Sequence, residues 1–124
     1  MEYKHSELTE KIIRCFFKVY NTLGYGFLEK VYERALAIEL RKSGLAVNKQ
    51  VPIDVFYEGE VVGNYYADLL VESEVILELK ATDGLVEEHE AQLLNYLKAT
   101  NIEIGLLLNF GLKPVVKRKI YSNK

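Results

Sequence analysis

Three charged side chains lie within two apolar segments in the middle of the chain. Asp68 lies in segment 65–71, Glu78 and Lys80 lie in segment 75–80, and the other residues of both segments are apolar or aromatic. In a strand, Glu78 and Lys80 would point to one face, because they are two residues apart. If the two strands are neighbours, Asp68 and Glu78 can converge on a hard divalent cation, which prefers oxygen ligands. The pattern therefore predicts a metal site.

The same residues also have ordinary structural explanations. Glu78 and Lys80 could form an ion pair on the solvated face of an edge strand, and Asp68 could be a hydrated carboxylate at a strand end. A buried carboxylate, in contrast, needs a partner or takes up a proton, because an unpaired buried charge costs several kcal/mol. Spacing alone does not decide between these alternatives.

Other polar residues on predicted helices could reach a site on the sheet. Glu29 lies at the start of a helix and borders its apolar stripe, with Tyr32 three residues later. Glu29 could equally be an acid that is favourable near a helix N-terminus, which contributes up to about 1 kcal/mol. Gln92 and Tyr96 are four residues apart and share one side of a later helix, where they could contact a phosphodiester backbone or a neighbouring loop.

Hydrophobic periodicity predicts the elements that carry these residues. Helical spacing runs from Ser6 to Gly24, then from Leu28 to Ser43, and again from Leu85 to Thr100. Strand-forming composition covers segments 51–57, 61–71 and 75–80, which we expect to form a meander. Segment 104–110 is almost entirely apolar and predicts a central buried strand, and the alternating lysines of segment 115–121 predict an edge strand. The predicted order is ααβββαββ, a mixed α/β fold.

Composition limits the class of protein. A chain of 124 residues with 49% apolar and 27% charged residues predicts a single domain over residues 1–124. No segment approaches the roughly 18 apolar residues of a membrane span, so we expect a cytoplasmic protein with no membrane contact. Cys15 is the only cysteine, which excludes an internal disulfide. The net charge of −2 argues against a nucleic-acid partner. This argument is weak, because a bound cation would offset part of the negative charge.

Taken in order, these motifs resemble a known family. The motifs are GFLEKVY at residues 26–32, Asp68, the Glu-Leu-Lys of residues 78–80, and QLLNY at residues 92–96. They resemble the GxxExxY family, a compact branch of the PD-(D/E)xK nuclease superfamily, and the resemblance extends from Glu7 to about Tyr121. One departure is Ala67, which stands where the superfamily pattern has a proline that binds nothing.

The resemblance implies a restriction-endonuclease-like core, with a mixed sheet of about four to five strands, helices on both faces and the site at one edge of the sheet. It implies that Mg²⁺ or Mn²⁺ is bound by the carboxylates of Asp68, Glu78 and Glu29 and by the main-chain carbonyl of Leu79. Lys80 would position or deprotonate the attacking water. The substrate contacts would come from Gln92 and Tyr96, which match the Gln-x-x-x-Tyr motif of the RecB-type branch, and from Tyr32.

The function expected from this resemblance is metal-dependent hydrolysis of nucleic acid, with DNA favoured over RNA. A non-catalytic module that binds nucleic acid or protein, and a metal-dependent hydrolase of another phosphate ester, are the alternatives. The chain has few surfaces for sequence readout, so a partner protein that supplies specificity is expected if cleavage is specific. Cutting both strands at once needs two active sites, so a homodimer is compatible with the function, and segment 115–121 could supply its interface.

Overall fold

The computed structural model of the protein describes residues 6–122, which form eight helices and strands in the predicted order ααβββαββ. Their bounds are α1 Ser6–Leu23, α2 Glu29–Lys42, β1 Val47–Tyr57, β2 Glu60–Val71, β3 Val75–Lys80, α3 Glu87–Lys98, β4 Ile104–Phe110 and β5 Pro114–Ile120. The largest difference from the predicted bounds is at β1, which begins four residues earlier than expected because residues 47–49 also pair with β2.

The strands of residues 6–122 form one five-stranded mixed sheet in the order β1-β2-β3-β4-β5. β3 and β4 are parallel, and every other neighbouring pair is antiparallel. α3 connects the parallel strands, which a tight turn cannot join. Every residue of β4 is buried and β5 lies at the edge of the sheet, so both predictions for these strands are confirmed.

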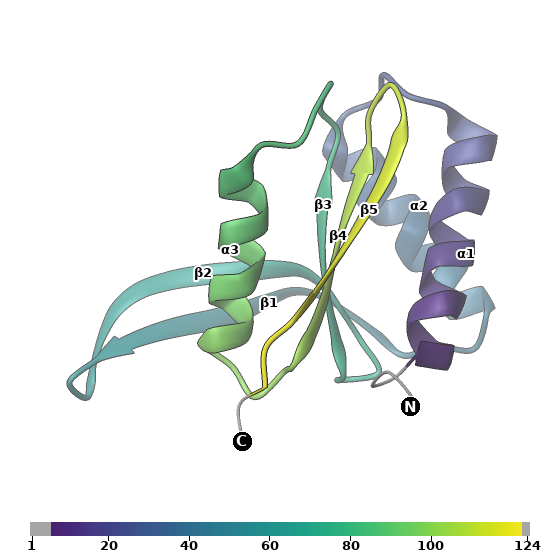
Figure 1. Ribbon diagram of the computed structural model, residues 1–124. Coiled ribbons are helices and arrows are strands. Elements are labelled where there is room, and N and C mark those ends of the chain that lie inside the picture. Colours follow the sequence, from purple (N-terminus) through teal and green to yellow (C-terminus); the bar gives the residue numbers. More distant parts are fainter. Residues whose placement is uncertain (1–5, 123–124) are drawn as a thin grey trace.

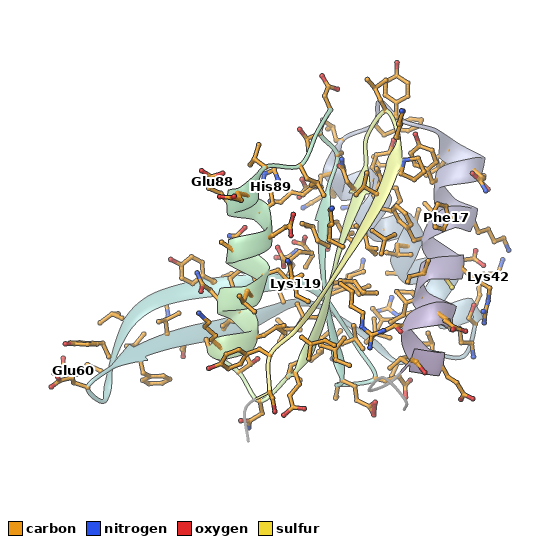
Figure 2. All side chains as sticks on the ribbon, viewed as in Figure 1. Phe17, Lys42, Glu60, Glu88, His89 and Lys119 are labelled. Carbon is orange, nitrogen blue, oxygen red and sulfur yellow. The ribbon has the colours of Figure 1, made fainter. Side chains whose placement is uncertain are left out.

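Helices cover both faces of this sheet (Figure 1). α1 and α2 pack on one face, where Phe16 and Leu36 belong to the same buried cluster as Leu77 of β3. α3 packs on the other face, where Leu93 belongs to a second cluster with Ile76. Lys119 of β5 points toward α3 (Figure 2) and forms an ion pair of 2.7 Å with Glu90. The predicted mixed α/β architecture is therefore confirmed. Within residues 6–122, no helix is long and apolar enough to cross a membrane.

β1 and β2 continue past the rest of the sheet as a long hairpin on the side of α3 (Figure 1). The two strands pair from Val47 and Val71 to Tyr57 and Glu60, and the turn residues 58 and 59 have φ values of 50° and 83°, as in a type I′ turn. β2 and β3, in contrast, share only three residue pairs, the last of which joins Leu69 to Leu77. Beyond this pair the two strands separate. We call this point the fork, and its first residues are Asp68 and Glu78.

Candidate active site at the fork of the sheet

Carboxylates replace the main-chain pairing at the fork. The Asp68 backbone N–H donates a hydrogen bond of 3.1 Å to Glu78 Oε1, and the Leu79 backbone N–H donates one of 2.8 Å to Asp68 Oδ2. Each acid therefore accepts a hydrogen bond from the opposite strand after the regular ladder has ended. The expectation that adjacent strands bring Asp68 and Glu78 together is confirmed by these two contacts.

The fork holds its acids in an unfavourable electrostatic environment. Glu78 is 5% exposed. Burial, and then the charge of Asp68, raise the pKa of Glu78 to about 8, although the Asp68 N–H and the Lys80 ammonium act in the opposite direction. Burial is also the main reason that the pKa of Asp68 is raised. A further cation at this point would lower both pKa values, because an opposite charge stabilises the ionised carboxylate.

Glu29 and Lys80 belong to the same electrostatic group. Glu29 begins α2, and partial burial of its carboxyl followed by repulsion from Asp68 raises its pKa. The Lys80 ammonium lowers the pKa of all three acids, Glu29, Asp68 and Glu78. The fork therefore combines three carboxylates, drawn from a helix and two strands, with one lysine.

The chain directly after Lys80 is fixed by a buried asparagine. Asn109 lies opposite Lys80 in the parallel β3–β4 pair and is 1% exposed. Its Oδ1 accepts a hydrogen bond of 3.1 Å from the Thr82 backbone N–H, and its Nδ2 donates one of 3.0 Å to the Thr82 carbonyl. A Cβ at Gly111 would lie 2.1 Å from the same Thr82 carbonyl oxygen, so only glycine fits there. These contacts hold the end of β3 and the lysine that it carries.

α3 brings Gln92 and Tyr96 to the fork from the other side of the sheet. Gln92 Nε2 donates a hydrogen bond of 2.9 Å to the Tyr96 hydroxyl oxygen, as expected for residues one turn apart. Burial, followed by the charges of Glu78 and Asp68, raises the pKa of Tyr96 to about 12. The phenol therefore remains protonated at neutral pH and can donate a hydrogen bond toward the fork.

Two residues that sequence reasoning did not identify also belong to this site. Gln50 Nε2 donates hydrogen bonds of 3.2 and 3.3 Å to the two carboxylate oxygens of Glu33, and the Gln50 side chain lies close enough to Asp68 to lower its pKa. Glu33 follows Glu29 by one helical turn, and this spacing could have indicated it. No such signal marks Gln50 in the sequence, because this residue lies before the predicted strand. In the structure its backbone adopts a left-handed φ of 50°. Non-glycine residues with such a φ often lie at functional sites.

Similarity to known proteins identifies the family to which this geometry belongs. The sequence pattern of the PD-(D/E)XK nuclease superfamily matches residues 6–120. The chain belongs to this superfamily. No curated protein matches the sequence.

Two solved structures share the fold of this chain. The crystal structure of SSO0001 has a TM-score of 0.59 and 19% sequence identity, and the similarity covers 97% of this chain and 61% of that protein. The alkaline exonuclease LHK-Exo from Laribacter hongkongensis has a TM-score of 0.55 and 11% identity, over 98% of this chain and 73% of the exonuclease. The chain thus spans about three fifths of the length of SSO0001, and both structures share its fold.

The residues at the fork fit the divalent cation that PD-(D/E)XK nucleases generally use. Asp68 and Glu78 are hard oxygen donors in contact with each other's strands, and burial is the main reason that the pKa values of both are raised. Within residues 6–122, no three His, Cys, Asp or Glu side chains already gather closely enough to hold a metal ion. Mg²⁺ is commonly bound by only one or two carboxylates and keeps several waters, so two acids are sufficient for such a site.

Tyr32 does not lie where the resemblance implied a substrate contact. Its side chain is 0% exposed and its ring stacks on Phe110 at a centroid distance of 4.3 Å. Its hydroxyl donates a hydrogen bond of 2.6 Å to the Gly24 carbonyl and accepts one of 3.2 Å from the Phe27 backbone N–H. The ring of Tyr32 therefore fills the core, and its hydroxyl fixes the loop before α2.

Proposed function

We propose that this chain is a metal-dependent nuclease that hydrolyses phosphodiester bonds, as a member of the GxxExxY family on the RecB-type branch, with DNA favoured over RNA. The observation that carries the proposal is the fork, where the carboxylates of Asp68 and Glu78 hydrogen-bond across two separating strands beside Lys80. Residues 1–124 would act as one nuclease domain.

Asp68 and Glu78 would hold Mg²⁺ or Mn²⁺, together with the main-chain carbonyl of Leu79, and Glu29 would approach from α2. When bound, the cation supplies positive charge for a phosphodiester and lowers the pKa of water. The hydrogen bonds from the Asp68 and Leu79 backbone N–H groups fix the two carboxylates before any ligand arrives. Such fixed geometry lowers the cost of placing the reacting groups.

Lys80 would orient the attacking water and offset the negative charge that develops on the phosphate. Its position near three carboxylates supports this role, because the Lys80 ammonium lowers the pKa of each of these acids. Gln92 and Tyr96 would contact the nucleic-acid backbone beside the fork. The amide of Gln92 donates to the Tyr96 oxygen, which leaves the phenolic hydrogen available for a phosphate oxygen.

Cleavage of single-stranded DNA and of plasmid DNA, each with and without Mg²⁺ or Mn²⁺, tests the proposal. Glu78→Ala and Lys80→Ala are expected to lose at least about 100-fold in rate, the scale of removing one group that stabilises the transition state. Matched controls are Glu60→Ala at the tip of the hairpin and Lys42→Ala at the opposite end of α2 from Glu29 (Figure 2). Equal cleavage by wild type and by both fork variants would overturn the assignment.

Calorimetric titration with Mn²⁺ separates a nuclease from a non-catalytic module on the same fold. A nuclease of this type should bind Mn²⁺, and Asp68→Ala and Glu78→Ala should weaken that binding, while a pure interaction module should show no binding that depends on these acids. Nucleotides and simple phosphate esters, used as alternative substrates with the same variants, test the remaining alternative. If these compounds were hydrolysed and nucleic acid was not, the substrate would be a small phosphate ester and the proposed nuclease activity would be wrong.

Cleavage of both strands of a duplex would require a second site, so we further propose a homodimer through the edge strand β5 or a partner protein that supplies specificity. The open edge of β5 supports the first arrangement, because unpaired strand edges can pair with a second chain. Sedimentation of the wild type at increasing concentration tests the homodimer, and a monomer at every concentration would rule it out.

A further inference from the structure

A groove lies between the β1–β2 hairpin and α3, next to the fork. Its volume is about 980 Å³, and the residues that line it include Val55, Phe56, Tyr65, Gln92, Asn95 and Tyr96. This volume is at the upper end of the roughly 300–1,000 Å³ that enclose small organic ligands. The groove therefore has room for more than one planar ring.

The groove and the fork share residues. Gln92 and Tyr96 line the groove, and Tyr96 is also close enough to Glu78 and Asp68 for their charges to raise its pKa. The hydrogen bond between Gln92 and Tyr96 thus lies at the junction between the two. A molecule with one group at the fork would have its neighbouring groups in this groove.

Aromatic side chains of the hairpin face this space. Phe56 is 62% exposed and Tyr65 is 45% exposed, and both line the groove. The Tyr65 ring lies 5.7 Å from the Tyr96 ring, and it approaches to 3.1 Å of the point where Gly63 would carry a Cβ. The absence of a side chain at Gly63 therefore lets the Tyr65 ring lie along its own strand, next to the groove. Large exposed rings gathered at one place mark a binding surface.

The charges around the groove favour bases over phosphates as its occupants. Asp54 and Glu88 line it together with Lys98, so its walls do not form a basic surface. Glu88 lies at the end of α3 away from the hairpin tip, which is marked by Glu60 (Figure 2). Phosphates are bound mainly by cationic side chains, whereas bases of any sequence stack on aromatic rings. In a duplex those base faces are covered by neighbouring pairs.

We propose that this groove binds unpaired nucleobases of a strand whose phosphodiester lies at the fork, which makes single-stranded nucleic acid the preferred substrate. The inference rests on the proposed function, because it takes the fork as the place of the phosphodiester. Phe56 and Tyr65 provide the stacking faces, and Gln92 and Tyr96 connect the bound bases to the reacting group.

Fluorescence anisotropy in EDTA tests the groove without cleavage. The probes are fluorescein-labelled oligo-dT and oligo-U of about 15 nucleotides, the length scale of single-strand binding sites, and a DNA hairpin duplex of the same length. Phe56→Ala and Tyr65→Ala are expected to weaken binding of the single strands by about fivefold to about a hundredfold, the effect of losing one stacked base. The oligo-dT and oligo-U arms distinguish DNA from RNA as the source of the bases.

Matched variants separate stacking from a general loss of apolar surface. Phe56→Tyr keeps a stacking face and should bind as wild type, whereas Phe56→Leu keeps apolar bulk and should bind as weakly as Phe56→Ala. Tyr25→Ala removes an aromatic ring that is 58% exposed but lies in the loop between α1 and α2, and it should change binding less than twofold. Thermal unfolding of each variant shows that the domain remains folded.

The outcomes distinguish this inference from the proposed function. Tight binding of the duplex, absence of single-strand binding, or equal weakening by Phe56→Ala and Tyr25→Ala would overturn the groove as a base-binding site. If the protein still cleaved nucleic acid in a metal-dependent way, the nuclease proposal would stand although the groove proposal had failed. Single-strand binding that depends on Phe56, in a wild-type protein that cleaves nothing with Mg²⁺ or Mn²⁺, would support the groove and remove the nuclease proposal.

Discussion

Replacement of Glu78 by glutamine is expected to make the stability of the metal-free protein much less dependent on pH. The pKa of Glu78 is about 8 in the folded protein, compared with an ordinary value of 4.5. At intermediate pH the folded chain therefore holds a proton that the unfolded chain releases. The contribution of this group to stability is fully present below about pH 4.5 and is lost as the pH rises through about 8.

The size of this effect follows from the two pKa values. For a single group that shifts from 4.5 to about 8, linkage gives a loss of about 3–4 kcal/mol in the free energy of unfolding between about pH 5 and about pH 8. Glu78 is only 5% exposed, so solvent screening reduces the effect little. Asp68 and Glu29 also have raised pKa values and add losses of the same sign, which remain in the variant. Domains of this size are stable by roughly 5–15 kcal/mol, so the difference is measurable.

Urea unfolding in EDTA at about pH 5 and about pH 8 measures the effect. The side chain introduced by Glu78→Gln keeps an oxygen that can accept the Asp68 N–H, so the variant removes the charge but not the hydrogen bond. Glu60→Gln neutralises an exposed carboxylate at the hairpin tip and should follow the wild type (Figure 2). If wild type and Glu78→Gln lost stability equally, within about 1 kcal/mol, the fork would not bury an ionisable carboxyl and the electrostatic argument for a cation there would be refuted.

Other contacts of the fork and its supports lead to further predictions. Gln50→Ala removes the amide that hydrogen-bonds Glu33 and lowers the pKa of Asp68, and it should weaken Mn²⁺ binding about tenfold in calorimetric titration; unchanged affinity would show that Gln50 does not support Asp68 as a ligand. Asn109→Ala leaves the Thr82 backbone groups unpaired and should lower the free energy of unfolding by about 2–3 kcal/mol in urea. Tyr32→Phe should cost about 1 kcal/mol of stability with cleavage within about twofold of wild type, whereas a large loss of cleavage at unchanged stability would restore a substrate role.

The elements that were predicted well are those whose burial follows the sequence directly. β4 is buried along its whole length, so its apolar sequence was sufficient to identify it as a central strand. The helical stripes of α1 and α2 face one cluster and were equally clear. The first residues of β1 were missed because residues 48–50 are polar and exposed, and Asn48 and Lys49 belong to the strand only through pairing with β2.

The candidate site was predicted in part for the same physical reason. Asp68, Glu78 and Lys80 are charged residues in apolar strands, and such residues stand out in a sequence. Gln50 does not stand out, because its role depends on a left-handed backbone that only the folded chain shows. Tyr32 shows the opposite limit, since its motif identified the position but could not show that the ring points into the core. The point at which β2 leaves β3 is likewise a property of strand pairing, which single-residue patterns do not encode.

The two hydrogen bonds that cross the fork, each from a backbone N–H of one strand to a carboxylate of the other, give this protein two spectroscopic reporters. The amide protons of Asp68 and Leu79 each point directly at a carboxylate oxygen, 3.1 and 2.8 Å away measured from the nitrogen. The chemical shift of an amide proton depends on the charge of the oxygen that it faces. These two resonances in a ¹⁵N-labelled sample should therefore follow the ionisation of Glu78 and Asp68 separately, and they should respond to an arriving cation before any substrate is added.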